Sequence, residues 1–175
     1  MSLHDTLGNL GTATGAQVMA LWTRWEAGEL TEAQFRALAG AVLVRAGARS
    51  AALADLALTA ALSAARQAVV VPVGLEAAPG VHAAARDAVA DTLGSVSYER
   101  DAPAAVAVLG SAFAYEQFQR SYGDGMRSHG VSYWQRVPNA GACGVCEDLS
   151  EGVVSADIPM WHHKGCMCVA QPITN

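Results

Sequence analysis

The chain holds all four of its cysteines in one stretch, residues 143–168, which reads CGVCEDLSEGVVSADIPMWHHKGCMC. They fall into two clusters, a C-x-x-C element and an H-x-x-C-x-C element, made of Cys143, Cys146, His163, Cys166 and Cys168. A zinc ion takes four thiolate or imidazole ligands in a tetrahedron, and a tight turn can supply two of them. Two clusters in one short stretch therefore predict one structural Zn²⁺ per chain.

The two clusters offer more candidate ligands than a tetrahedral ion can take. We expect Cys143, Cys146 and His163 to bind the metal, together with either Cys166 or Cys168. The sequence leaves the choice between these last two cysteines open. The one that is not used would pack as a small apolar residue.

Other interpretations of the cysteines are weaker. Two disulfides would suit a secreted protein, but the first residues, MSLHD, lack the basic start and apolar run of a signal peptide. A redox C-x-x-C needs the strand-to-helix setting of a βαβ unit, which does not surround Cys143. A catalytic Cys–His pair would leave the other cysteines without a role. His162 is an alternative ligand to His163, although we expect it to be an exposed neighbour.

The charge and the apolar runs of the chain argue against two classes of partner, nucleic acids and membranes. With a net charge of −5 and a single lysine, Lys164, the chain lacks the cations that sequence-independent nucleic-acid binding requires. Arg120, Arg127 and Arg136 are interpreted as part of a solvated face. No apolar run reaches the roughly 18 uninterrupted residues of a membrane span. We therefore expect no membrane partner and no strong direct DNA binding.

The first part of the chain is predicted to be helical. Of the 36 alanines, 32 precede residue 139, and alanine has the highest helix propensity. Thr31 and Gln34 have the spacing of a capping box. Gly40 and Gly47 leave open whether the helix that follows is one bent helix or two. The predicted helices cover about 15–27, 31–67, 81–93 and 103–129, with 69–74 (VVVPVG) as an extended linker.

The tail is predicted to be rich in strands. Alternating side chains over 131–137 favour a strand, and further strands are expected at 152–154 and 167–172, with a helical turn at 147–149. So small a module has few large apolar groups, so a metal cross-link would help to hold it together. The predicted fold class is mainly α, or α+β overall: an alanine-rich helical domain (1–130) followed by a small β-rich zinc-binding module (131–175).

The tail also resembles a known family. Cys143-x-x-Cys146, a Leu-x-x-Gly step at 149–152, His163-x-x-Cys166-x-Cys168 and a closing Pro172 resemble the C-terminal signature of MuF-type phage head morphogenesis proteins. The likeness covers about 131–173, a quarter of the chain. Lys164 stands where the family usually has proline, and Met167 stands where it usually has arginine. Residues 1–130 carry no motif that matches the family.

The resemblance implies a structural protein of a tailed phage. Such a minor head protein would be made in the host cytoplasm and reside in the virion head near the portal vertex. Its partners would be the portal protein, the major capsid protein or both, and it would be present in multiple copies. No G-x-S-x-G, P-loop or HExxH motif occurs, so we expect no enzyme. The alternative is a zinc-stabilised nucleic-acid-binding or adaptor module.

Overall fold

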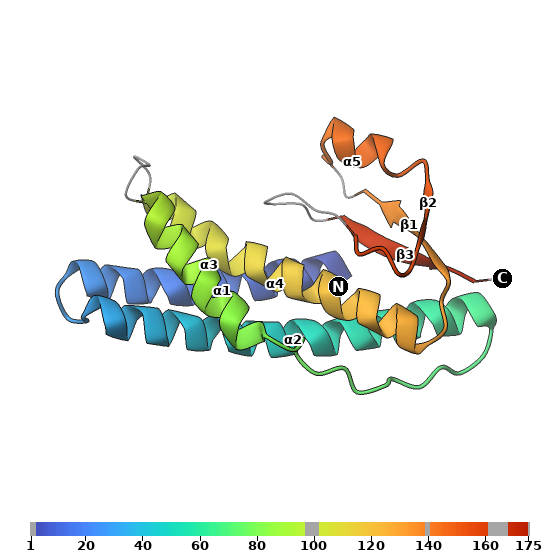
Figure 1. Cartoon of the computed structure of the whole chain (residues 1–175), viewed down its shortest axis with the longest axis horizontal. Helices are drawn as coiled ribbons and strands as arrows, with labels where there is room; N and C mark the ends of the chain where they lie inside the picture. Colours follow the sequence, from blue (N-terminus) through green and yellow to red (C-terminus); the bar gives the residue numbers. More distant parts are fainter. Residues whose placement is uncertain (1–2, 97–101, 139–140, 161–167, 175) are drawn as a thin grey trace.

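The computed structural model describes residues 3–96, 102–138, 141–160 and 168–174. Four long helices precede a small sheet, and Figure 1 shows the sheet resting over one end of the helices. The elements are α1 (Leu3–Glu26), α2 (Glu32–Arg66), α3 (Val81–Val96), α4 (Ala102–Ser128), β1 (Tyr133–Val137), α5 (Gly144–Asp148), β2 (Val153–Ser155) and β3 (Val169–Ile173). The prediction of a mainly helical α+β fold is confirmed.

Helix α2 is a single helix of 35 residues. The predicted capping box is present: the backbone N–H of Gln34 donates to the Thr31 hydroxyl, and the Gln34 side chain accepts from the Thr31 backbone N–H. These bonds satisfy donors that the first helical turn leaves without intrahelical partners. Neither Gly40 nor Gly47 divides the helix, so the two-helix alternative is wrong.

The apolar side chains of α2 are not all buried. Leu38 and Leu56 are 43% and 59% exposed. The inner positions of α2 hold large side chains, among them Phe35, Leu43 and Leu58, and small ones, among them Ala39 and Ala51. Alanine alternates with these larger groups on the buried face, and other leucines of the helix remain outside.

Helix α1 begins well before the predicted residue 15, because glycines inside it are used for packing. A Cβ atom at Gly11 would lie 2.9 Å from the Cα of Ser111, and one at Gly110 would lie 2.7 Å from the Cα of Gly15. Contacts this short mean that α1 and α4 cross almost backbone to backbone. This packing offsets the low helix propensity of glycine, which is roughly 1 kcal/mol less favourable than alanine per residue. A sequence pattern alone cannot reveal such packing between two helices.

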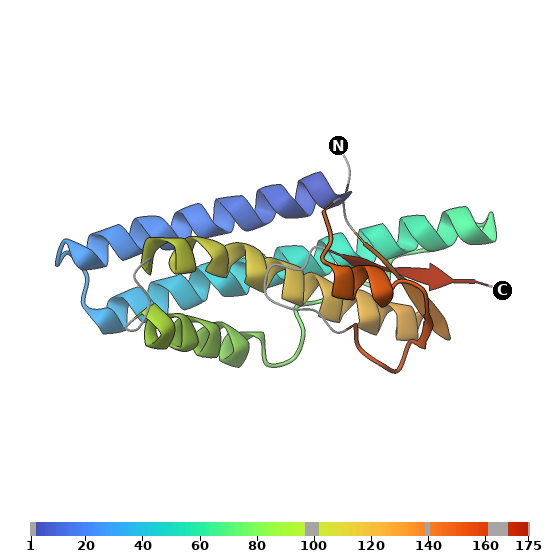
Figure 2. The same cartoon turned by 90° about the horizontal axis from the view of Figure 1, so that it is seen from above.

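The segment between α2 and α3 is extended, as predicted, and forms no strand. Figures 1 and 2 show it running back along the helices from the end of α2. Asp55, which is buried in α2, accepts hydrogen bonds from the backbone N–H groups of Val73, Gly74 and Leu75 at 3.1, 2.7 and 3.1 Å. A buried carboxylate thus holds the linker against the helix.

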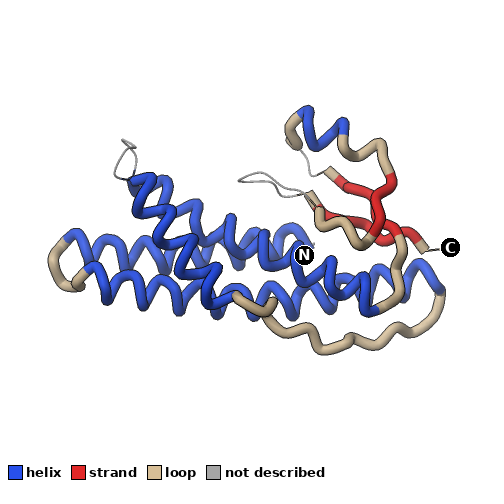
Figure 3. Tube along the Cα trace, viewed as in Figure 1, coloured by secondary structure: helices blue, strands red, loops and turns tan. Residues whose placement is uncertain are grey.

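The three strands form an antiparallel sheet in the order β2-β1-β3. Trp134 lies opposite Val154 on one side and Pro172 on the other. The change from helix to strand seen in Figure 3 falls between Ser128 and Tyr133, where the domain boundary was predicted. One hydrophobic cluster nevertheless includes residues from both parts: Leu7, Leu58, Phe118, Tyr122, Trp134, Ala156 and Ala170. The sheet therefore shares its core with the helices.

Helix α2 alone among the described residues has the length and apolar composition of a membrane span. Half of that apolar window is buried inside the protein. Core helices of helical bundles pass the same test, so the composition of α2 does not by itself indicate a membrane.

Candidate metal centre

The first cysteine cluster is folded by the short helix α5. Cys143 is its N-cap residue, with extended backbone angles, and its carbonyl accepts from the N–H groups of Cys146 and Glu147 at 2.9 and 3.1 Å. The turn brings Cys146 back toward the protein, where its side chain is only 1% exposed. Cys143 is exposed. The C-x-x-C element therefore forms a turn in which Cys146 is buried and Cys143 is exposed.

Cys168 of the second cluster lies beside Cys146, because it directly precedes β3. Arg136 pairs with Ala170 across the β1–β3 ladder, so Cys168 lies one step before β3 on the same face as Ala170. Cys168 is 1% exposed and forms one small cluster with Cys146, which Ala142 and Met160 flank. Two cysteines far apart in the sequence thus meet in an apolar setting.

The other predicted ligands are placed less fully. His163, Cys166 and the alternative ligand His162 lie outside the described residues. Within 3–96, 102–138, 141–160 and 168–174, no three His, Cys, Asp or Glu side chains gather closely enough to hold a metal ion. The described part of the chain thus contributes the buried pair Cys146 and Cys168, and the complete ligand set remains a prediction.

Arg136 was interpreted as part of a solvated face, and that prediction is wrong. Its side chain points inward from β1 and is 3% exposed. Its Nη1 donates to the Sγ of Cys146 at 3.8 Å. Arg120 and Arg127 are about half exposed, as predicted, and pair with Glu116 and Asp124. Arg136 differs from them because the alternation of β1 places it on the same face as the buried Trp134.

A second side chain reaches the centre from the helices. Gln119 of α4 is buried, and its Nε2 donates to the backbone carbonyl of Cys168 at 2.5 Å. The sequence does not mark this residue, because Gln117 and Ser121 beside it are also polar and no local pattern distinguishes Gln119. Arg127 adds a parallel link, since its Nη1 donates to the carbonyl of Ala156 at 3.3 Å.

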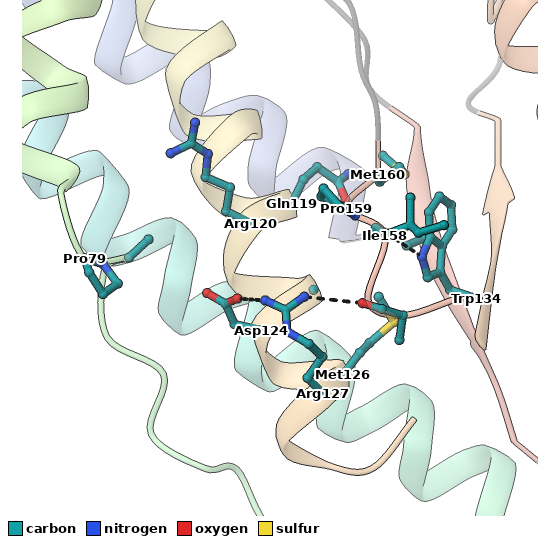
Figure 4. A pocket seen from close by; sticks show the side chains of 14 residues that line it. Pro79, Gln119, Arg120, Asp124, Met126, Arg127, Trp134, Ile158, Pro159 and Met160 are labelled. Carbon is teal, nitrogen blue, oxygen red and sulfur yellow. Dashed lines mark hydrogen bonds and ion pairs between the residues drawn. The ribbon is translucent and has the colours of Figure 1, made fainter. Parts of the chain in front are cut away.

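A pocket of about 240 Å³ lies beside this junction. Figure 4 shows α4 as its floor, with Pro79 on one side and Trp134, Ile158 and Met160 on the other. Its two arginines, Arg120 and Arg127, each pair with a carboxylate. Both arginines of this pocket are therefore held in ion pairs along α4.

The donors in the described residues fit a soft metal. Cysteine sulfur is preferred by zinc and other soft or borderline ions, and two cysteines lie together here. Burial in an apolar cluster suits a closed structural site better than an open catalytic one.

Comparison with known proteins yields no match of any kind. No protein-family model matches the chain, no curated protein matches it, and no solved structure matches it.

Proposed function

We propose that the chain is a structural minor head protein of a tailed phage, whose tail module is held together by one zinc ion. The pattern of cysteines and histidine supports this, because it resembles the MuF-type signature in order and spacing. The main structural support is the buried pair Cys146 and Cys168, which joins the two clusters of that signature. The proposed ligands are Cys143, Cys146, Cys168 and His163, with Cys166 as the cysteine left over.

The zinc ion would act as a cross-link and not as a reagent. When bound, it would fix α5 to the start of β3 and add folding free energy to a module with little core of its own. Two side chains of the protein also hold the module in place. Gln119 of α4 donates to the Cys168 backbone. Trp134 packs in the shared core, and its Nε1 donates to the carbonyl of Ile158 at 3.2 Å. The module would therefore be a rigid extension of the helices.

Association with the portal or shell is supported by apolar side chains on the outside of the helical part. Leu56 on α2 is exposed, as are Val69, Val71 and Val73 in the linker that follows. Monomeric proteins rarely leave large apolar areas uncovered, and such areas often mark contacts with other proteins. The acidic net charge opposes a primary role in binding DNA.

The test is co-expression of the chain with the portal and major capsid proteins encoded by the same phage. We expect the chain to co-purify with portal rings or assembled heads, in several copies, as measured by size exclusion and mass spectrometry. A chain that elutes as a lone monomer in the presence of both partners, and is missing from the heads, would contradict the proposal.

A further inference from the structure

A groove with basic side chains lies between α2 and α3, away from the candidate metal centre. Its volume is about 420 Å³. On α2 the small side chains of Ala37 and Ala41 line it, and the basic residues that share the groove are Arg36, Arg45, His82 and Arg86. His82 and Arg86 lie four residues apart in α3 and therefore project from one side of that helix. The groove thus combines a small apolar floor with positive charge.

Two of these arginines are not balanced by a neighbouring carboxylate. Arg36 pairs with Glu32, but within residues 3–96, 102–138, 141–160 and 168–174 neither Arg45 nor Arg86 forms an ion pair. Both side chains are exposed. On a chain with a net charge of −5, the groove is therefore a local region of positive potential that attracts acidic groups.

The opposite charge is found on α5 and the turn that follows it. Glu147, Asp148 and Glu151 are exposed, and none of their carboxylates forms an ion pair with another described residue. Val145 and Leu149 in the same stretch are 54% and 44% exposed. Residues 145–151 thus present acidic and apolar side chains together, which complements the groove in both charge and polarity.

Helix α5 does not lie near the groove of its own chain. Figures 1 and 2 show α5 beside the sheet, whereas the groove belongs to the N-terminal half of α2 and the start of α3. We propose that the groove of one copy binds α5 and the following turn of a second copy, so that the chains associate head to tail. In this contact Glu147 and Asp148 pair with Arg45 and Arg86, and Leu149 packs on the alanine floor.

Two properties of the groove favour a protein segment over a nucleic acid. The apolar floor adds buried area for an apolar side chain, as in other grooves that bind amphipathic segments. A phosphate backbone is instead held by many cationic contacts, and the groove offers few unpaired arginines. An acidic segment that also carries apolar residues therefore matches the groove better.

Head-to-tail association uses a different surface on each partner, so it can repeat from copy to copy. Such contacts form a ring where the rotation between copies closes, and a filament where it does not. The inference depends neither on the zinc ion nor on the phage role, and its failure would leave the proposed function intact.

The first experiment is sedimentation velocity of the unmodified full chain over a range of protein concentrations, at low and at high salt. We expect oligomers at low salt that dissociate at high salt, because salt screens exposed charge pairs. A chain that is monomeric at low salt, or oligomers that salt does not affect, would overturn the inference. A monomeric chain that retards duplex DNA through Arg45 and Arg86 would also overturn it and assign the groove to nucleic acid.

The second experiment exchanges the charges of the two surfaces. The groove variant carries Arg45→Glu and Arg86→Glu, and the α5 variant carries Glu147→Arg and Asp148→Arg. Each variant alone should associate about tenfold more weakly or less, because like charges then face each other. An equimolar mixture should restore association, because the acidic groove of one variant meets the basic α5 of the other.

The control is Arg66→Glu, a charge reversal at the far end of α2 from the groove. It should associate like the unmodified chain. Two variants with the circular dichroism of the unmodified chain whose mixture stays monomeric would overturn the inference. If either variant fails to fold, the salt series on the unmodified chain decides the matter.

Discussion

The side-chain amide of Gln119 donates a hydrogen bond to the backbone carbonyl of Cys168 across 2.5 Å. One partner belongs to α4 and the other precedes β3, so the bond joins the helices to the proposed metal centre. Both groups are buried, which makes the bond costly to lose. It explains how a small module can be held at a fixed place on a helical protein.

Replacing Gln119 with methionine should therefore weaken the junction. Methionine has a similar shape but leaves the Cys168 carbonyl without this donor, at a cost of about 1–3 kcal/mol. Urea unfolding should show the loss, and hydrogen exchange should rise at the start of β3. Gln17→Met, at an exposed position of α1, is the matched control and should change little. Equal stability of the two variants would show that the bond contributes nothing.

The close crossing of α1 and α4 leads to a paired glycine prediction. Gly110→Ala would push a Cβ atom into the backbone of α1, and overpacking of this kind usually costs about 1–3 kcal/mol. Gly40→Ala, in α2, meets no atom within 4 Å and should raise the free energy of unfolding by about 0.5–1 kcal/mol. Thermal melts would compare the two. A melting temperature of Gly110→Ala that is unchanged or raised would contradict the close crossing.

Alkaline pH should reveal the burial of Tyr122. Burial raises the pKa of this phenol from 10.0 to about 12. In the unfolded chain the phenol ionises first, so the unfolded state binds fewer protons between these values and stability falls as pH rises through them. The loss amounts to at most about 3 kcal/mol. Below pH 10 the phenol is protonated in both states, so the full stability is retained.

The measurement is the free energy of unfolding from pH 9 upward, in the unmodified protein and in Tyr122→Phe. The variant should lose stability less steeply over this range, because phenylalanine cannot ionise. Tyr133→Phe, at a half-exposed position of β1, should keep the original slope. Identical slopes in all three proteins would contradict the buried position of the phenol.

Cys146→Ser should lower the free energy of unfolding of the tail module by several kcal/mol. The reason is that a structural zinc site contributes its binding energy to folding. A chelator should destabilise the unmodified protein in the same way and have no further effect on the variant. The melting of β1–β3 can be followed through the hydrogen exchange of their backbone amides. Unchanged melting together with unchanged metal content in the variant would refute the role of Cys146.

Much of the architecture was predictable because its signals are local. The capping box at Thr31, the extended linker and the strand positions around β1, β2 and β3 all follow from neighbouring residues. The start of α1 was not predictable in this way, because its glycines are favourable only against the backbone of α4. The same applies to Leu56, which is exposed although Leu58 and Leu62 of the same helix are buried.

Two residues of the candidate site were predictable, but their surroundings were not. Cys146 and Cys168 were both candidate ligands, and the structure brings them together. Arg136 was misjudged because alternation in β1 allows two phases, and composition favours placing Tyr133 and Val137 inside. The structure takes the opposite phase and buries Trp134 and Arg136. A one-residue change of register inverts every side chain, and the packing of Trp134 against the helices decides it.

The most direct test of the central claim is the zinc content of the full chain purified without a metal-affinity tag, with its thiols titrated in parallel. We predict about one zinc per chain and no disulfide. A protein without zinc, whose cysteines are joined in disulfides, would contradict the zinc module and remove the main support for a phage head protein.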